Sequence, residues 1–204
     1  MSVRGIIIHK IIGNVNRGAV LKRKSYFTTY KIVFIGVMAA IVCAVTFLRF
    51  PLLGSKVHFA NAMCLLSGLL FGPMGGGLAA GIGSALYDGL FGEYDLIQCL
   101  ITFASKFFMA YICAVIAYKR ENRGRLLAGC FTGAVSYVLL YMLKTFVYQR
   151  FVYGYPMETV WVTMLSKLPA SLINAAVSVI AAPMFYTALA PALRRAGLLK
   201  RIEE

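Results

Sequence analysis

The chain has 204 residues, of which 60% are hydrophobic and 14% are charged, with 21 Lys and Arg against 7 Asp and Glu. A soluble domain of this length cannot bury so much apolar surface, so the composition excludes a water-soluble globular protein and indicates a protein of the lipid bilayer. The net charge of +14 does not indicate nucleic-acid binding, because the basic residues form clusters before, between and after the apolar segments, where they flank membrane spans.

Six apolar segments approach the length of about 20 residues that a helix needs to cross a bilayer. They lie at residues 31–50, 57–72, 74–92, 96–118, 126–148 and 160–189. Only Gly72-Pro73 separates the second from the third, so a hydropathy window would merge them and give five. We count six because a proline flanked by glycines breaks a helix. The sequence therefore predicts an all-α integral membrane protein with six transmembrane helices.

The basic residues predict the orientation in the membrane. Seven Lys and Arg lie between Arg4 and Lys31, four lie in residues 119–125, and four follow the last span. With six spans these three clusters share one side, which the positive-inside rule places in the cytoplasm together with both termini.

The chain divides into three expected parts. They are a basic cytoplasmic leader at 1–30, a six-helix transmembrane domain at 31–189 and a cytoplasmic tail at 190–204. No cleavable signal peptide is visible, because the longest apolar run of the leader is too short for an h-region. Part of the leader is alternatively a misassigned translation start, or an amphipathic segment that lies on the membrane surface.

No motif indicates catalysis, a metal site or a cofactor. The five cysteines lie within spans and have neither C-x-x-C nor His-paired spacing, so we interpret them as small buried apolar residues. The glycine-rich run at 72–83 lacks the Lys-Ser/Thr pair of a phosphate-binding loop and follows no soluble strand. We therefore predict a protein that is not an enzyme and has no cofactor.

The polar residues inside the spans gather in the outer halves, whereas the inner halves are almost purely apolar. A charged residue near the centre of a membrane helix costs roughly 2.5–3.5 kcal/mol, so these side chains should face one another or water. The pattern predicts an outward-facing polar cavity that is closed at its cytoplasmic end. The candidate substrate-binding residues are His58, Asn61, Asp88, Lys106, Tyr141, Lys144, Trp161, Lys167 and Asn174.

Several of these candidates have a purely structural alternative. Lys144 and, less readily, Lys106 and Lys167 are alternatively lysines that snorkel to the outer headgroups. Asp88 either contacts a ligand or neutralises one of the three lysines. Trp161 belongs either to the interfacial aromatic belt or to a surface that stacks on a flat ligand.

His58, at the outer start of the second span, is alternatively an interfacial histidine that contacts no ligand. Pro169 lies inside the sixth span, where it removes a helical hydrogen bond, so we expect a kink beside Lys167 and Asn174 that helps this helix to line the cavity.

Small residues at four-residue spacing mark faces where membrane helices approach closely. The third span carries two such stripes, Gly77, Gly81, Ala85, Gly89 and Gly76, Ala80, Ser84, Asp88. We expect them to pack inside the protein. The first span carries Gly36, Ala40 and Ala44, a face that suits either internal packing or a partner subunit.

The segment FLRFPLLGSKVHFANAMCLLSGLLFGPMGGGLAAGIGSALYDGLFG, the fourth span with Lys106, and KLPASLINAA at 167–176 together resemble a known family. They are similar to the substrate-binding S component of an energy-coupling factor (ECF) transporter, in the branch that takes up riboflavin, cobalamin and similar micronutrients. The resemblance covers most of residues 31–189. It implies a multi-pass protein of the cell membrane that captures a water-soluble vitamin from outside, with residues 49–56 as a lid.

The resemblance also implies partners. S components deliver their vitamin inward together with a transmembrane coupling protein and two cytosolic ATPases. An Ala-x-x-x-Ala motif of the first helix docks on the coupling protein, a role that carries over to Ala40 and Ala44 with Gly36 extending the face. The substrate does not carry over. Three lysines favour an anionic or carbonyl-rich ligand, and the outer aromatic residues favour a flat ring.

The resemblance leaves a second class of function open. The chain is alternatively a small membrane scaffold or assembly protein that has no small-molecule ligand and uses its small-residue faces to hold partners. A self-sufficient channel or secondary transporter would also need polar residues through the inner halves of the spans, which the sequence lacks.

Overall fold

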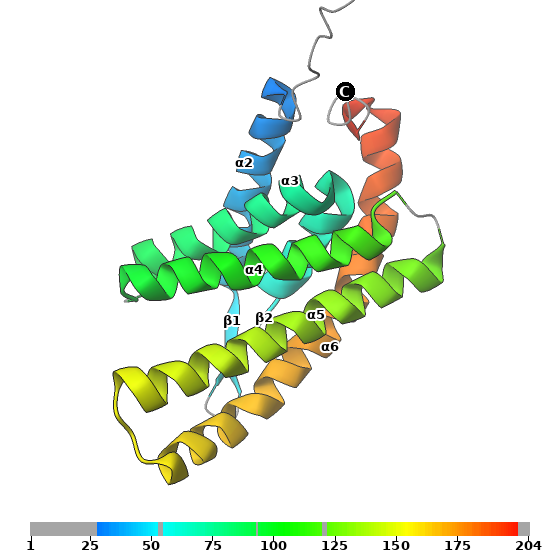
Figure 1. The fold of residues 1–204 in the computed structure, drawn as a ribbon. Helices are drawn as coiled ribbons and strands as arrows, with labels where there is room; N and C mark the ends of the chain where they lie inside the picture. Colours follow the sequence, from blue (N-terminus) through cyan, green and yellow to red (C-terminus); the bar gives the residue numbers. More distant parts are fainter. Residues whose placement is uncertain (1–27, 53–54, 93, 120–121, 200–204) are drawn as a thin grey trace, which may run out of the picture.

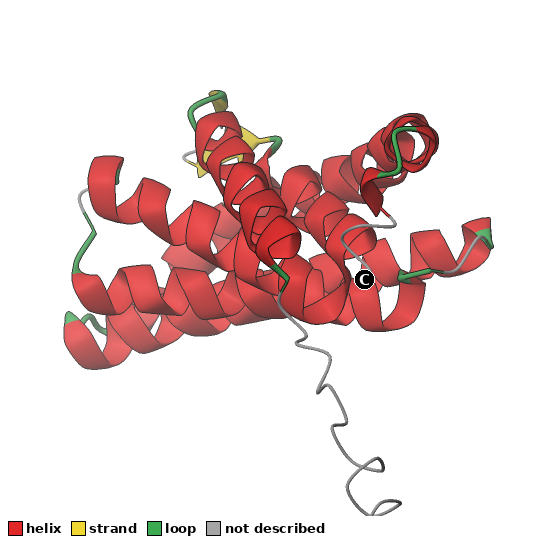
Figure 2. Cartoon of the chain, turned by 90° about the horizontal axis from the view of Figure 1, so that it is seen from above, coloured by secondary structure: helices red, strands yellow, loops and turns green. Residues whose placement is uncertain are grey.

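The computed structural model describes residues 28–52, 55–92, 94–119 and 122–199. Within these residues, five helices are long and apolar enough to cross a membrane, and they form a bundle with a two-stranded hairpin at its edge (Figures 1 and 2). The helices are α2 (Thr29–Thr46), α3 (Ala60–Phe91), α4 (Leu96–Ala117), α5 (Arg123–Val147) and α6 (Met157–Arg195), and a short π-helical turn, η1 (Tyr148–Val152), follows α5. Most of the expected leader, residues 1–27, lies outside the described residues.

The sequence predicts two spans across residues 57–92, and the structure has two helical arms there, which share the label α3 and meet at one non-helical residue. Gly72 has φ 76° and ψ −176°, a backbone conformation that a residue with a Cβ atom rarely adopts, and Pro73 follows it. The chain thus breaks its helical geometry where the sequence places the turn. By length and hydropathy, however, α3 is one of five candidate spans in the described part of the chain.

The two arms of α3 touch backbone to backbone. A Cβ atom on Gly76 would lie 2.4 Å from the Cα atom of Gly68, so a side chain cannot be accommodated at this crossing. The hydroxyl of Ser67 bridges the arms, 2.7 Å from the carbonyl oxygen of Cys64 and 2.8 Å from that of Gly76. The small residues therefore allow the close approach that stabilises helix packing in lipid.

The other glycine stripe of α3 packs against α4. Cβ atoms on Gly77 and Gly81 would lie 2.8 Å from the rings of Phe107 and Phe103, respectively. Both rings belong to α4 and are stacked on each other, with centroids 6.1 Å apart. The expectation that these stripes pack inside the protein is confirmed at Gly76, Gly77 and Gly81.

A β-hairpin between α2 and α3 is the part of the fold that the sequence analysis did not predict. The expected spans run to residue 50 and start again at 57, but α2 ends at Thr46 and α3 begins at Ala60. Between them, β1 (Arg49–Leu52) pairs with antiparallel β2 (Ser55–His58) (Figure 2). Both strands are edges of a two-stranded sheet, where a proline such as Pro51 is tolerated. The membrane bundle is all-α as predicted, and the hairpin adds to it.

The last helix is longer than predicted. α6 runs from Met157 to Arg195, whereas the sequence places the span at 160–189 and a tail from 190 onward. Its hydrogen-bonding pattern continues through Pro169, Pro183 and Pro191, and Figure 1 shows the helix changing direction between its first and second halves. α6 is therefore bent but unbroken, and the kink expected at Pro169 itself stays a prediction.

The apolar core fills one end of the bundle. Its most deeply buried large side chains include Leu65, Leu66 and Leu69 from the first arm of α3 and Met109 from α4. Four of the five cysteines are also buried, and all five are free thiols. This end corresponds to the inner halves of the spans, which the sequence identifies as almost purely apolar.

Candidate functional site

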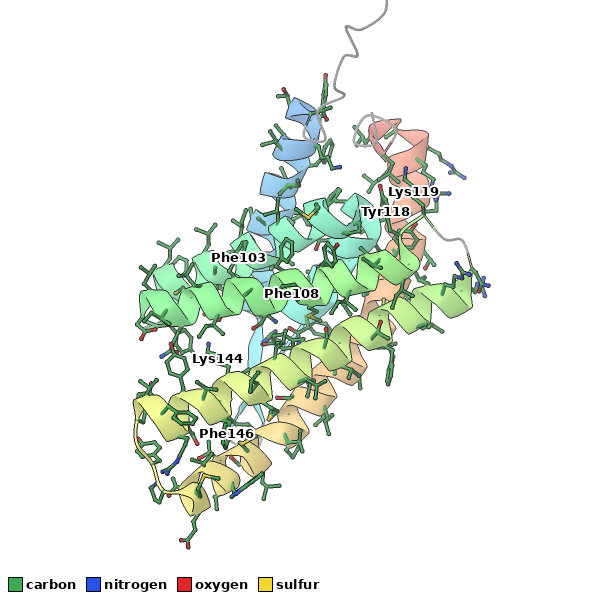
Figure 3. The ribbon with its side chains drawn as sticks, viewed as in Figure 1. Phe103, Phe108, Tyr118, Lys119, Lys144 and Phe146 are labelled. Carbon is green, nitrogen blue, oxygen red and sulfur yellow. The ribbon has the colours of Figure 1, made fainter. Side chains whose placement is uncertain are left out.

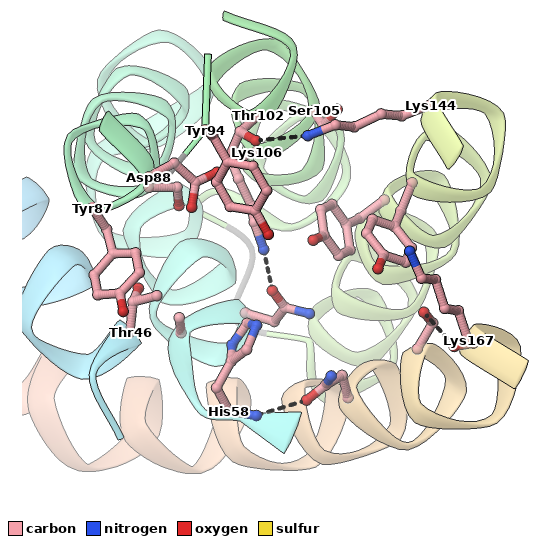
Figure 4. Close-up of a pocket in the computed structure, with 17 residues that line it drawn as sticks. Thr46, His58, Tyr87, Asp88, Tyr94, Thr102, Ser105, Lys106, Lys144 and Lys167 are labelled. Atoms are coloured by element: carbon pink, nitrogen blue, oxygen red, sulfur yellow. Dashed lines mark hydrogen bonds between the residues drawn. The ribbon is translucent and has the colours of Figure 1, made fainter. Parts of the chain in front are cut away.

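The polar ends of the helices enclose a cavity of about 520 Å³ (Figure 4). Each long helix contributes to its wall: α2 at its last residue, α3 at both ends, α4 and α6 in their first halves, and α5 in its second half. Consecutive helices run in alternating directions, so these are the parts that meet at one end of the bundle. The cavity lies at the polar end, and the apolar core lies beyond it.

Eight of the nine predicted binding residues line this cavity. They are His58, Asn61, Asp88, Lys106, Tyr141, Lys144, Lys167 and Asn174. They come from β2 and from four different helices, and the most distant pair is separated by 116 positions in the sequence. The structure therefore agrees with the inference that the polar groups in the outer halves of the spans face one another.

Lys106 is the most deeply buried charge of the site, with 4% of its surface exposed. Its ammonium group donates a hydrogen bond to the side-chain oxygen of Asn61, which is 1% exposed. The same nitrogen lies 3.7 Å from the centre of the Tyr137 ring, a cation–π contact. Lys106 thus lies against two neutral groups and points into the bundle, so it does not snorkel to the headgroups.

Lys144 and Lys167 extend into the cavity from α5 and α6. The ammonium group of Lys144 donates to the hydroxyl of Thr102 at 3.4 Å and lies 5.4 Å from the centre of the Tyr94 ring. Figure 4 shows Lys144 on α5 reaching toward Thr102 on α4, and Lys167 extending from α6. Both side chains are partly buried. The three lysines therefore converge on one cavity from three helices.

Asp88 lies on the second arm of α3, close to Tyr94 in Figure 4. Among the described residues, no ammonium or guanidinium group forms an ion pair with its carboxylate within 4 Å. Its side chain is only partly buried and lines the cavity. The sequence leaves two roles open for Asp88, contact with a ligand and neutralisation of a lysine. The structure shows no direct ion pair between Asp88 and a lysine of the described residues.

The hairpin is attached to the cavity wall by one long-range hydrogen bond. The main-chain N–H of His58, the last residue of β2, donates to the side-chain oxygen of Asn174 on α6 at 2.9 Å. Both residues line the cavity. The end of the hairpin is thereby held against α6, at the edge of the site.

Trp161 is the predicted binding residue that the structure places elsewhere. It is 54% exposed and is absent from the lining of the cavity. Lys167, Ser171 and Asn174 share one face of α6, and Trp161 lies about 120° around the helix from Lys167 at 3.6 residues per turn. It belongs to the outer surface of the bundle, in agreement with the aromatic-belt alternative.

The lining also includes residues that the sequence analysis missed. They are Thr46, Ala60, Ser84, Tyr87, Tyr94, Thr102, Ser105, Tyr137 and Ser171. Four of these stand four residues from a predicted one: Ser84 from Asp88, Thr102 from Lys106, Tyr137 from Tyr141, and Ser171 from Lys167. Extending each predicted residue by one helical turn would have identified them.

A second candidate surface lies on α2. A Cβ atom on Gly36 would meet no atom within 4 Å, and Ala40 and Ala44 on the same face are exposed. The neighbouring Val33 and Val37 are 57% and 51% exposed. The opposite face of α2 packs on α3, where a Cβ atom on Gly83 would lie 2.3 Å from the carbonyl oxygen of Ala39. One side of α2 is thus built into the bundle, and the small-residue side faces outward.

Comparison with known proteins assigns the chain to a family. A family model described as the S component of the ECF-type riboflavin transporter matches residues 26–191. The chain belongs to this family. An S component is a substrate-binding subunit of a vitamin transporter and not an enzyme, and the apolar helices agree with a multi-pass membrane protein.

One relative by sequence and two solved structures are also similar to the chain. A protein of Pyrococcus woesei, described as an uncharacterized protein in the gap 3′ region, is 32% identical over 110 residues, which are 53% of this chain and 72% of the relative. The S component of a bacterial ECF transporter has a similar structure, with a TM-score of 0.63 and 21% identity over 80% of this chain and 96% of that chain. FolT bound with folic acid has a TM-score of 0.56 and 22% identity over 78% and 94%. At these identities the two structures show that the S-component fold is shared.

Proposed function

We propose that this S component captures a water-soluble vitamin, or a related micronutrient, in the cavity between the polar ends of its helices, and releases it on the other side of the membrane. The observation that supports this most directly is the cavity of about 520 Å³, which eight residues predicted from the sequence line together. Cavities of about 300–1,000 Å³ are typical of small-molecule sites. The apolar core behind it provides no polar path through the bundle, so the chain binds a solute without conducting it.

The proposal includes an orientation. Six membrane-spanning segments, with the two arms of α3 counted separately, place both termini in the cytoplasm and the cavity on the outside. The start of α2 and the end of α6 lie toward the same end of the bundle in Figure 1, which supports this arrangement. The basic residues that surround these ends agree with it, because positive charge favours the cytoplasmic side.

The proposal also includes partners. An S component has no ATP-binding motif of its own, so release of the vitamin requires a transmembrane coupling protein and two cytosolic ATPases. The outward face of α2 at Gly36, Ala40 and Ala44 suits such a docking role, because helices associate in lipid by close approach of small residues. The hairpin that ends at His58 is the lid of the cavity in this proposal.

The test is to identify what the protein carries. The full chain is purified in detergent from cells grown in rich medium and denatured, and the released compounds are identified by chromatography and mass spectrometry. We expect a small heterocycle in near-stoichiometric amount. Riboflavin, after which the family is named, is the first standard for comparison. If no compound is released and no vitamin of a panel raises the melting temperature, the chain is a membrane scaffold instead.

A further inference from the structure

The charges around the cavity do not balance. Three ammonium groups, those of Lys106, Lys144 and Lys167, line it, and among the lining residues that the structure describes the carboxylate of Asp88 is the only acidic group. Three positive charges less one negative charge leave a formal charge of +2, with His58 counted as neutral. Asp95 directly precedes α4 and caps this helix, because its side chain accepts a hydrogen bond from the main-chain N–H of Gln98. It does not line the cavity.

The partners of these ammonium groups within the protein are neutral. Lys106 contacts the Asn61 side-chain oxygen and the Tyr137 ring, as described above. Lys144 contacts the Thr102 hydroxyl and the Tyr94 ring. Among the described residues, no side chain accepts a hydrogen bond from the ammonium group of Lys167. In this part of the chain no carboxylate lies within 4 Å of any of the three ammonium groups, and the charges of Asp88 and Asp95 act on Lys144 only from a greater distance.

Several like charges in a partly enclosed site repel one another, and removal of an ammonium group from water is costly unless an opposite charge is supplied. In a protein that must bind a small molecule, the ligand is the natural source of that charge. Hydrogen bonds between an ammonium and a carboxylate or phosphate are also among the strongest that proteins make.

The remaining lining residues accommodate a ring. Tyr137 and Tyr141, one turn apart on α5, are stacked with ring centroids 6.1 Å apart, and Tyr87 and Tyr94 also line the cavity. Aromatic faces of this kind stack on flat heterocycles. Lys106 contacts the ring of Tyr137, and Lys144 lies about one turn from Tyr141 on α5, so a ring and an anionic group can be bound together.

We propose that the substrate of this S component is an organic anion with at least two negative charges at neutral pH, in the form of a phosphomonoester or a pair of carboxylates attached to a flat ring. The inference rests on the proposed function and specifies its ligand. Consequently, a neutral vitamin is a weaker ligand than its phosphorylated or carboxylated counterpart.

The experiment uses pairs of compounds that differ in the charged group. Binding of riboflavin and riboflavin 5′-phosphate, and of pyridoxal and pyridoxal 5′-phosphate, is measured by calorimetry on the purified full chain. In any pair that binds, the more negative member should bind at least tenfold more tightly. Equal or tighter binding of the neutral member overturns the proposal. Binding of inorganic phosphate is measured separately. If phosphate binds as tightly as the organic anion, the ring is not recognised and the proposal is also overturned.

Two lysine variants and one control connect the effect to this site. Lys144→Gln and Lys167→Gln should each weaken binding of the anion at least tenfold and leave binding of the neutral member within threefold. Lys119→Gln is the control, because Lys119 lies at the far end of α4 from Lys144 (Figure 3) and contacts the ring of Tyr118 instead. Unchanged anion binding in both cavity variants would contradict the inference.

If neither member of any pair binds, the charge of the compound that the purified protein releases on denaturation tests the inference. A released compound with at least two negative charges at neutral pH supports the inference, and one with fewer negative charges overturns it. Release of no compound, together with no binding in any pair, instead rejects the proposed function. Failure of the ligand class and failure of the function thus give different results.

Discussion

The ammonium nitrogen of Lys106 lies 3.7 Å from the centre of the Tyr137 ring and thereby connects α4 to α5 in the wall of the cavity. A desolvated cation–π contact of this kind stabilises by about 2 kcal/mol, and the hydrogen bond to Asn61 adds to it. A charge that is buried in this way is held by the protein before any ligand arrives. Such a preorganised group is suited to ligand binding, because it does not have to be ordered when the ligand enters.

Replacement of Lys106 by methionine tests this role. Lys106→Met keeps most of the side-chain volume and removes the charge, and exchange of a buried charge for an apolar group is often neutral for stability. We expect the melting temperature to stay within about 5 °C and the affinity for the released compound to fall at least tenfold, about 1.4 kcal/mol. Calorimetry and thermal melts of the same preparation give both values. Unchanged affinity would show that Lys106 is only structural.

The crossing of the two α3 arms predicts a position where even one methyl group is harmful. Gly76→Ala should lower the free energy of unfolding by about 1–3 kcal/mol, because the new Cβ atom would overlap the backbone of Gly68. Gly36→Ala is the matched control, since its Cβ atom meets nothing within 4 Å, and it should leave stability unchanged or slightly raised. Thermal melts in detergent compare the two. Equal effects would mean that the arms are not in contact.

The face of α2 predicts a variant that separates ligand binding from partner binding. Ala40→Trp should abolish vitamin uptake in cells and co-purification of the ATPases, because a large side chain prevents close approach of the coupling protein. Ligand affinity of the isolated chain should remain within threefold. Leu139→Trp, at a position that is 65% exposed on α5, is the control and should preserve uptake. Loss of ligand binding in Ala40→Trp would place this face inside the protein's own fold.

The hydrogen bond between the hairpin and α6 predicts the dynamics of the lid. Asn174→Leu removes the acceptor of the His58 N–H, and loss of one such bond costs about 1 kcal/mol. We expect hydrogen exchange in residues 49–59 to accelerate about fivefold, as measured by mass spectrometry. Asn174→Asp keeps an acceptor oxygen at this position and should keep the protection. Equal protection in all three proteins would show that other contacts hold the hairpin.

A comparison of two aromatic residues tests the placement of the cavity. Tyr141→Ala removes a lining ring and should weaken binding of the released compound at least tenfold. Trp161→Ala removes a ring that is 54% exposed and outside the lining, so its effect should stay within twofold. The opposite order would mean that the ligand binds near the start of α6 instead.

The sequence predicts the location of the site well because a membrane restricts where polar groups can lie. Once the spans are placed, the outer position of Lys106, Lys144 and Lys167 follows from counting residues, and the cost of charge in lipid requires them to face inward. The structure places all three on one cavity. The same reasoning overlooks Tyr87, Tyr94 and Tyr137, because an outer tyrosine is equally typical of an interfacial belt and only its angular position on the helix distinguishes the two.

The parts that the sequence does not predict depend on contacts between distant segments. The strands at residues 49–58 contain no alternation of apolar and polar residues long enough to indicate a hairpin, and the end of β2 is held by Asn174, 116 positions away. Similarly, the local sequence predicts the break at Gly72-Pro73, but it does not show that the two arms of α3 touch at Gly68 and Gly76. Such features are determined by tertiary packing.

The most direct test of the proposed function is an experimental structure of the full chain saturated with the compound that it releases on denaturation. We predict density for one molecule in the cavity between Asn61 and Lys167, with its anionic group within hydrogen-bond distance of a lysine ammonium and its ring against Tyr137 or Tyr141. Density at another place on the protein, with this cavity filled only by water, would contradict the assignment of the cavity as the substrate site.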